Sequence, residues 1–197
     1  EGTLSSADSE YVNSTGFGSN GNGVTGSANS TFVYVAIRRP HKPAEEFAAT
    51  DLFAIDTIGG TNGGSVPSYH SGFPVDMFIQ GRTDSDNRQL FTRLLQGTRL
   101  FPNLTNAESA ESDADFDYQD GAFNNTSVGT DRIGYMFRRA GGFFDVVAYT
   151  GNGSAGNTVN HNLGVVPELM IIRKRNQASN WEVFVGSAGP TKRIYLD

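Results

Sequence analysis

The segment PVDMFIQGRTDSDNRQLF, residues 74–91, has a counterpart later in the chain, PELMIIRKRNQASNWEVF, residues 167–184. The gapless alignment contains six identities: Pro74/Pro167, Met77/Met170, Ile79/Ile172, Arg82/Arg175, Asn87/Asn180 and Phe91/Phe184. Two unrelated segments of this length share about one identity. We therefore interpret the chain as carrying a duplicated module. The alignment predicts equivalent strands, with Met77 and Met170 facing equivalent cores.

The duplication extends to neighbouring segments. VYVAIRRP at 33–40 matches IGYMFRRA at 133–140, and ADSEY at 7–11 matches ADFDY at 114–118. The period is about 100 residues, which is the size of a domain. We expect residues 1–39 to be the end of one module, 40–140 a complete module and 141–197 the start of the next. The alternative phase places two modules at 1–104 and 105–197.

Strand-forming runs dominate the chain, with Gly- and Asn-rich turns between them. The runs are TFVYVAI (31–37), DNRQLFTRLLQ (86–96), DVVAYT (145–150), LMIIRKR (169–175) and WEVFV (181–185). GNGSAG (151–156) is typical of a hairpin turn, and AEEFAATDLF (44–53) of a turn or two of helix. The 14 Phe and 7 Tyr supply much of the expected core. We predict an all-β chain of tandem antiparallel β-sandwich or jelly-roll-like modules of about 100 residues.

Composition argues against several classes of protein. The net charge is −6, which disfavours nucleic-acid binding because that needs a basic surface. The sequence contains no Cys, so it has no disulfide framework and no thiolate chemistry. No apolar run approaches the length of about 20 residues that spans a bilayer, and EGTLSSADSE lacks the features of a signal peptide. We expect no membrane insertion.

Catalytic motifs are not evident in the sequence. His70 and His161 occupy matching places before a Gly and Pro turn, so we interpret both as structural, and neither they nor His41 have metal-ligand spacing. The sequence has no nucleophile elbow and no phosphate-binding loop. We expect no enzymatic activity, no catalytic residues and no cofactor.

The acidic stretch ESDADFDYQDG, residues 111–121, leaves two interpretations open. Asp113, Asp115, Asp117 and Asp120 resemble the start of a calcium loop, although the sixth-position Gly and the acidic twelfth residue are missing. The other interpretation is a strand with Ala114, Phe116 and Tyr118 facing the core and the aspartates facing solvent. The sequence does not decide whether Asp113, Asp115 and Asp117 bind calcium.

Two further groups of residues are candidates for binding. Trp181 is the only Trp and replaces Arg88 of the first copy, so it is the candidate for glycan stacking. The pairs Arg38-Arg39 and Arg138-Arg139 each end an apolar strand, where guanidinium groups can bind the next module or chain. The acidic partners nearest to these pairs in sequence are Glu45, Glu46 and Asp145. The alternative, weighted equally, is that both arginine pairs are solvated strand ends.

The segment from Tyr135 to Phe184 is similar to a repeated module of tail-fibre and other virion structural proteins of marine bacteriophages. The similarity lies in Phe-Arg-Arg, FFDVV-YTGNG, HNLG-VPE and a W-V strand, read in that order. The first copy keeps AIRRP, the His70 turn and Pro74, but has AIDTIGGTNGG in place of the YTGNG segment. The resemblance implies repeated β-rich domains in an extracellular appendage of the virion, and it supplies no catalytic residues.

We therefore expect a structural protein of a phage particle, a tail fibre or capsid-attached fibre that serves host attachment. Its expected partners are copies of itself in a symmetric homo-oligomer, with a trimer as the first expectation, other virion proteins and a host surface glycan. The alternative is a secreted glycan-binding module or bacterial surface adhesin, with a hydrolase third. The host receptor, the position on the particle and the oligomer number do not follow from the sequence, nor does whether the chain belongs to a longer polypeptide.

Overall fold

The computed structural model describes residues 10–12, 16–19, 31–37, 47–57, 67–82, 87–112, 114–124, 132–189 and 192–197. These residues form β-strands, turns and the short 3-10 segments η2 (Ala49–Asp51), η3 (Arg93–Leu95) and η4 (Gly186–Ala188). The all-β prediction is confirmed. Within these ranges, no helix has the length and apolar character needed to cross a membrane.

The chain divides into two compact units. Unit 1 comprises residues 1–45, 105–107 and 140–197, and unit 2 comprises residues 46–104 and 108–139. The segments at 1–39 and 141–197, which the sequence assigns to the ends of two different modules, therefore belong to one unit. Unit 2 lies between them in sequence.

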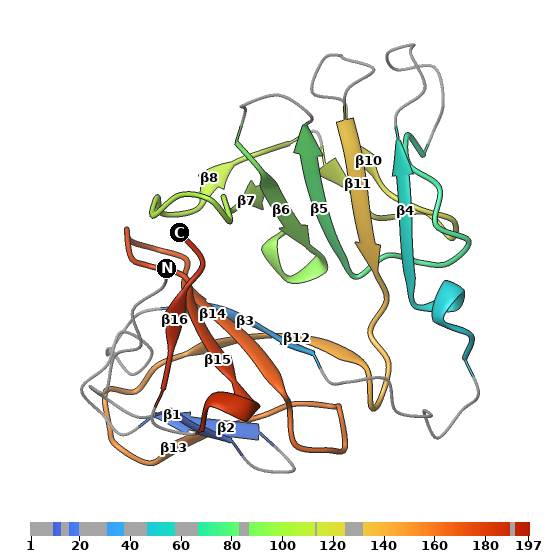
Figure 1. Cartoon of the computed structure of the whole chain (residues 1–197). Coiled ribbons are helices and arrows are strands. Elements are labelled where there is room, and N and C mark those ends of the chain that lie inside the picture. Colours follow the sequence, from blue (N-terminus) through green and yellow to red (C-terminus); the bar gives the residue numbers. More distant parts are fainter. Residues whose placement is uncertain are drawn as a thin grey trace. The chain divides into compact units, whose positions relative to one another are not determined.

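Unit 1 contains a five-stranded and a three-stranded sheet (Figure 1). The larger sheet has the order β12 (Phe144–Thr150), β3 (Thr31–Ile37), β14 (Leu169–Lys174), β15 (Glu182–Val185), β16 (Ile194–Tyr195), and the smaller has the order β1 (Glu10–Val12), β2 (Gly16–Ser19), β13 (Asn157–Asn160). The core cluster on one face of the larger sheet holds Met170, Ile172 and Phe184, and Val159 of β13 packs against it. The smaller sheet thus covers that face, as in a β-sandwich.

Unit 2 contains a four-stranded sheet and two short pairs of strands (Figure 1). The sheet has the order β4 (Phe53–Thr57), β11 (Arg132–Phe137), β5 (Met77–Arg82), β6 (Gln89–Thr92), and the pairs are β9 (Ala114–Asp115) with β10 (Phe123–Asn124) and β7 (Thr98–Arg99) with β8 (Ser109–Ala110). Phe78, Phe91 and Met136 of the sheet pack with Tyr69 and Phe73 in a buried cluster. Aromatic side chains dominate this core, as the composition predicts.

The two large sheets repeat one four-strand pattern with the same register. In unit 2 Phe137 of the second strand lies opposite Phe53 and Met77, and in unit 1 Ile37 lies opposite Phe144 and Leu169. The next neighbours also correspond, since Met77 lies opposite Thr92 and Leu169 opposite Val185. The order β4-β11-β5-β6 is thus equivalent to β12-β3-β14-β15.

The prediction that Met77 and Met170 face equivalent cores is wrong by one residue. The register makes Leu169 the counterpart of Met77, and Met170 the counterpart of Phe78. Phe78 and Met170 lie opposite Phe91 and Phe184, and both pairs belong to their core clusters. The connection to the next strand is one residue longer in the second copy, and a gapless alignment absorbs that residue by shifting the strand, which exchanges its two faces.

Two local predictions also need correction. GNGSAG is not a hairpin turn, because β12 pairs with β3 and β13 pairs with β2 in another sheet. Its glycines Gly153 and Gly156 do have positive φ angles, 74° and 78°. The segment at 86–96 is a strand only over Gln89–Thr92 and continues as η3, which the Thr92 side chain caps by accepting a hydrogen bond from Leu94 N–H.

Candidate functional site

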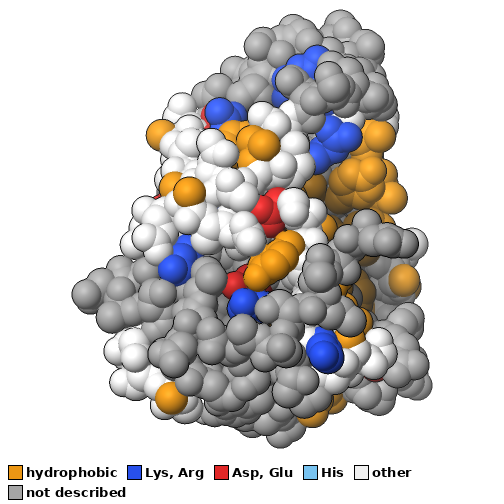
Figure 2. Space-filling view, turned by 60° about the vertical axis from the view of Figure 1, so that its left-hand side comes forward, with side chains coloured by type: hydrophobic (Ala, Val, Ile, Leu, Met, Phe, Trp, Pro, Cys, Tyr) orange, Lys and Arg blue, Asp and Glu red, His pale blue; other side chains and the backbone are white. Residues whose placement is uncertain are grey.

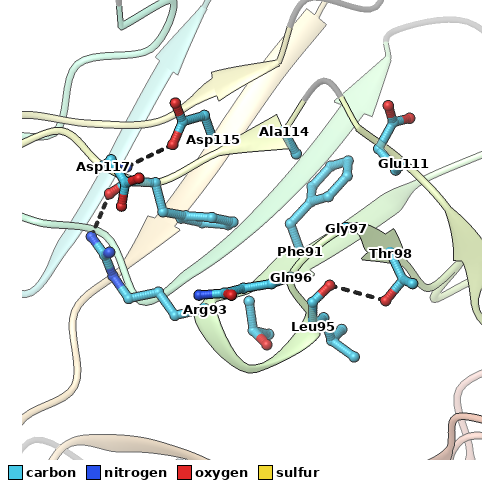
Figure 3. A pocket seen from close by; sticks show the side chains of 12 residues that line it. Phe91, Arg93, Leu95, Gln96, Gly97, Thr98, Glu111, Ala114, Asp115 and Asp117 are labelled. Atoms are coloured by element: carbon cyan, nitrogen blue, oxygen red, sulfur yellow. Dashed lines mark hydrogen bonds between the residues drawn. The ribbon is translucent and has the colours of Figure 1, made fainter.

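A cavity of about 170 Å³ lies in unit 2 beside the acidic stretch (Figure 3). Its walls come from the end of β6, the η3 turn and the segment around β9, and they include Arg93, Thr98, Glu111, Asp115 and Asp117. Neither of the described histidines, His70 and His161, lines it. Asp115 and Asp117 are two of the aspartates that the sequence singles out as calcium ligands, so a ligand in this cavity would meet them.

Most polar groups of this cavity hold the protein itself together. Arg93 donates from Nε to the Val75 carbonyl at 2.7 Å and from Nη2 to the Phe116 carbonyl at 2.6 Å, and its guanidinium lies 5.8 Å from the Phe116 ring centre. Glu111 pairs with Arg99, and the Thr98 hydroxyl donates to the Leu95 carbonyl at 2.9 Å. Figure 3 shows the bond from Arg93 to the backbone of the acidic stretch and the Thr98–Leu95 bond along the cavity wall. These contacts connect strands and turns of unit 2.

The described residues do not form a cluster of carboxylates that would support the calcium interpretation. Asp115 accepts a hydrogen bond from Asp117 N–H at 2.9 Å, and Asp120 accepts from Gly72 N–H at 2.5 Å. Among the residues that the structure describes, no three His, Asp or Glu side chains could hold a metal ion together. Asp113 lies outside the described residues. Ala114 and Phe116 pack against the core of unit 2, in accord with the strand interpretation, although the strand ends at Asp115.

The two described histidines have different surroundings. His70 is exposed, and its Nδ1 lies 3.2 Å from Asp120 Oδ2. The hydrogen bond from the Gly72 N–H has the largest effect on Asp120 and the contact with His70 the second largest. Together they hold the pKa of Asp120 below its ordinary value of 3.8. His161 is buried, and its Nδ1 accepts a hydrogen bond from Leu163 N–H at 3.3 Å. The His161 ring therefore contacts its own turn, whereas the His70 ring contacts Asp120 of the acidic stretch. His41 lies outside the described residues.

An aspartate anchors each histidine turn, a feature that the repeat alignment misses. Asp56 accepts hydrogen bonds from Thr57 N–H and His70 N–H, both at 2.8 Å. Asp145 accepts from Val146 N–H at 2.9 Å and from Asn162 N–H at 2.7 Å. The register places Asp145 opposite Ala36 and Asp56 opposite Gly134, two positions apart on the same face of equivalent strands. Because they occupy different columns, sequence comparison does not pair them.

The described arginine pair makes its contacts within unit 2. Arg138 N–H donates to the Leu52 carbonyl at 2.9 Å, and its guanidinium lies 5.3 Å from the Phe47 ring centre. Arg139 donates to Asp76, from its backbone N–H at 2.7 Å and from Nε at 3.3 Å. Its acidic partner is thus Asp76, while Asp145 holds a turn. Arg38, Arg39, Glu45 and Glu46 lie outside the described residues.

Trp181 lies in the core of unit 1. It is 1% exposed, and the Arg173 guanidinium lies 5.6 Å from its ring centre. The Trp181 backbone N–H donates to Asp197 at 2.7 Å. The Arg173 guanidinium beside the ring is itself largely removed from solvent, and this burial lowers its pKa. Stacking on a sugar requires an exposed ring face. Trp181 offers no such face here.

A buried polar network in unit 2 is a second feature that sequence reasoning misses. The amide of Gln80 donates to the Tyr69 hydroxyl at 2.9 Å and accepts from Arg132 Nη1 at 2.7 Å. All of these side chains are buried, so the network ties β11 to β5 and to the Tyr69 segment. In the second copy Ile172 stands in the place of Gln80, and the corresponding position is apolar.

Comparison with known proteins adds one partial match. The family described as "Domain of unknown function (DUF7483)" matches residues 139–197. The matched stretch includes β12 to β16 of unit 1 and excludes β3, the strand between β12 and β14. No curated protein and no solved structure matches the chain.

Proposed function

We propose that this chain is a structural protein of a bacteriophage particle, a tail fibre or capsid-attached fibre that serves host attachment as an extracellular appendage. The observation that carries the proposal is the repetition of one four-strand sheet, in order and register, in both units. A repeated sheet can be added in line, which lengthens a fibre without new chemistry.

The use of polar side chains supports a structural role. Arg93, Asp145 and Asp56 bind backbone groups that fix turns and strands. In Figure 2, described Asp and Glu side chains lie next to hydrophobic side chains and Lys or Arg side chains.

The self-association and the phage setting rest on the sequence resemblance. The proposed partners are further copies of this chain and other virion proteins, with a host surface glycan as the attachment target. The alternative, a secreted glycan-binding module or adhesin, loses its best single candidate because the Trp181 ring is buried. We therefore place attachment in the assembled appendage rather than at this residue.

Immunogold electron microscopy of purified particles tests the proposal. Antibodies against the recombinant chain should label appendages on particles from the producing culture, and the chain should sediment with those particles in a density gradient. An unrelated soluble protein of the same culture serves as the control for trapping. If the chain stays in the soluble fraction and no particle is labelled, the virion assignment fails, and glycan-array binding of the free chain would then favour the alternative.

A further inference from the structure

The second strand of each repeated sheet, β11 in unit 2 and β3 in unit 1, comes from the other sequence copy. The first copy runs β3, β4, β5, β6, and the second runs β11, β12, β14, β15. β3 nevertheless pairs with β12 and β14, while β11 pairs with β4 and β5. Each copy therefore gives its first strand to the sheet that the other copy builds.

The sheet of unit 1 would be destabilised if no strand lay between β12 and β14. β3 has seven register pairs with β12 and six with β14, so it satisfies backbone groups of both neighbours. Its Val33 and Val35 are 2% and 4% exposed. Removing β3 would open two unpaired strand edges in the middle of the sheet and would expose apolar surface. The sheet of unit 1 is therefore an acceptor that requires a donor strand.

β3 is not a suitable replacement for β11 in unit 2. Gly134 of β11 corresponds to Tyr34, and a Cβ at Gly134 would lie only 2.7 Å from ring carbons of Phe78 and Tyr69. Arg132, which donates to Gln80, corresponds to Phe32, so β3 would also break the buried polar network. Steric exclusion and the unsatisfied amide together direct β3 to a unit 1 sheet.

A unit 1 sheet can receive β3 from two sources. Within one chain, the whole of unit 2 separates Ile37 from Phe144 in sequence. Filling the sheet therefore closes a long loop, at an entropic cost, until unit 2 folds and brings Phe53 opposite Phe137. A second copy offers an identical strand and makes the same hydrogen bonds without closing that loop. The DUF7483 match, residues 139–197, likewise covers the acceptor strands without the donor.

We propose that β3 is exchanged between molecules, so that β3 of one copy fills the place between β12 and β14 of a second copy of this chain. Each molecule then has one donor strand and one acceptor sheet, and repeated donation joins copies head to tail. The inference deepens the proposed function by naming the contact through which copies associate, and its role in a fibre rests on that function. The strand exchange itself is tested separately.

Engineered disulfides provide the test, because the chain contains no Cys. Thr31 of β3 and Thr150 of β12 are register partners, and Thr150 is exposed. One copy carries Thr31→Cys and the other Thr150→Cys, and the two are unfolded, refolded together at high concentration and oxidised. We expect a disulfide-linked pair that contains one copy of each variant, seen at twice the 21.2 kDa mass of the chain on a non-reducing gel in excess of the dimer that either variant forms alone.

The control pairs the Thr31→Cys copy with a Thr158→Cys copy, because Thr158 is equally exposed but belongs to β13 in the other sheet. The double variant Thr31→Cys/Thr150→Cys should form linked oligomers at high concentration and an internal disulfide at low concentration. A Thr31–Thr150 mixed pair that is no more abundant than the control overturns the proposal, whether or not the double variant links within one chain. Particle labelling does not depend on this result, so failure of the exchange and failure of the virion assignment are distinguishable.

Discussion

The substitution Gly134→Ala should destabilise unit 2 selectively. Gly134 lies in β11, and a Cβ at this position would lie 2.7 Å from Phe78 Cε2 and from Tyr69 Cδ1. Carbon atoms in contact prefer about 3.5–4.0 Å, so both rings must move by roughly an ångström. Both rings are fully buried and lie 4.9 Å apart, which leaves them no solvent to move into. Overpacking of this kind costs about 1–3 kcal/mol.

The expected signal is a lower melting temperature for one of the two units. A loss of 1 kcal/mol lowers the Tm of a domain of this size by about 4–8 °C, so the fall should be about 5–20 °C. Circular dichroism should show the loss, whereas fluorescence of Trp181, which reports unit 1, should melt as in the unmodified chain. The matched control is Gly81→Ala in β5 of the same sheet. There the new Cβ comes closest to the flexible Arg88 chain, at 3.3 Å, and lies at an ordinary contact distance of 3.8 Å from Tyr135 Cε2.

The magnitude also has an internal check. Phe78→Leu removes one of the two obstructing rings, so Gly134→Ala should cost less in that background than alone, with a coupling of about 0.5–3 kcal/mol. If Gly134→Ala melts like Gly81→Ala, or if the two substitutions add without coupling, β11 is not packed against Phe78 and Tyr69 and the assignment of β11 to unit 2 is refuted.

Three further outcomes are expected. Asp145→Ala should lower the stability of unit 1 by about 1.5–3 kcal/mol in urea unfolding, because a buried carboxylate that accepts two backbone N–H groups is lost; an unchanged midpoint would contradict the anchor. The pKa of Asp120 is lowered in the folded chain, so the stability that its ionised carboxylate contributes should be present above pH 3.8 and be lost as the pH falls further. Asp120→Asn should remove this part of the pH dependence of stability. Identical acid-unfolding profiles for the variant and the unmodified chain would refute the contact of Asp120 with the His70 turn. Trp181 should emit at short wavelength and resist acrylamide quenching until unit 1 unfolds, and quenching of the native chain as strong as that of free tryptophan would show an exposed ring.

The sequence is a good guide to element type and to the existence of a repeat. Runs such as TFVYVAI and LMIIRKR are strands, because their β-branched and apolar residues fit a sheet that is buried on both faces. The 44–53 segment yields one turn of 3-10 helix, η2. The weak points are register and connection. One additional residue before β15 shifts Met170 by one position, and no local signal reports it.

Two features could not be predicted from the sequence, for a physical reason: that β3 and β11 each join the sheet of the other sequence copy, and that polar side chains anchor the turns. β3 and β11 are both compatible with a central strand by pattern, and only the space at Gly134 and the Arg132–Gln80 bond decide where each belongs. Those contacts join residues that are distant in sequence. Asp145 and Trp181 show the same limit, since their types suggest an exposed acid and a binding aromatic, whereas the structure buries both. Burial depends on the assembled sheet.

The strand partner of β3 tests the central claim most directly. Nuclear Overhauser effects between backbone protons of β3 and its neighbours report that partner without any substitution. Our account predicts contacts of Val35 with Val146 and Ile171, the register positions on β12 and β14. If each sequence copy instead built its own sheet, β3 would occupy the place of β11, and Val35 would contact Ile55 and Ile79, the partners of Tyr135. Contacts from Val35 to Ile55 in place of Val146 would contradict the account.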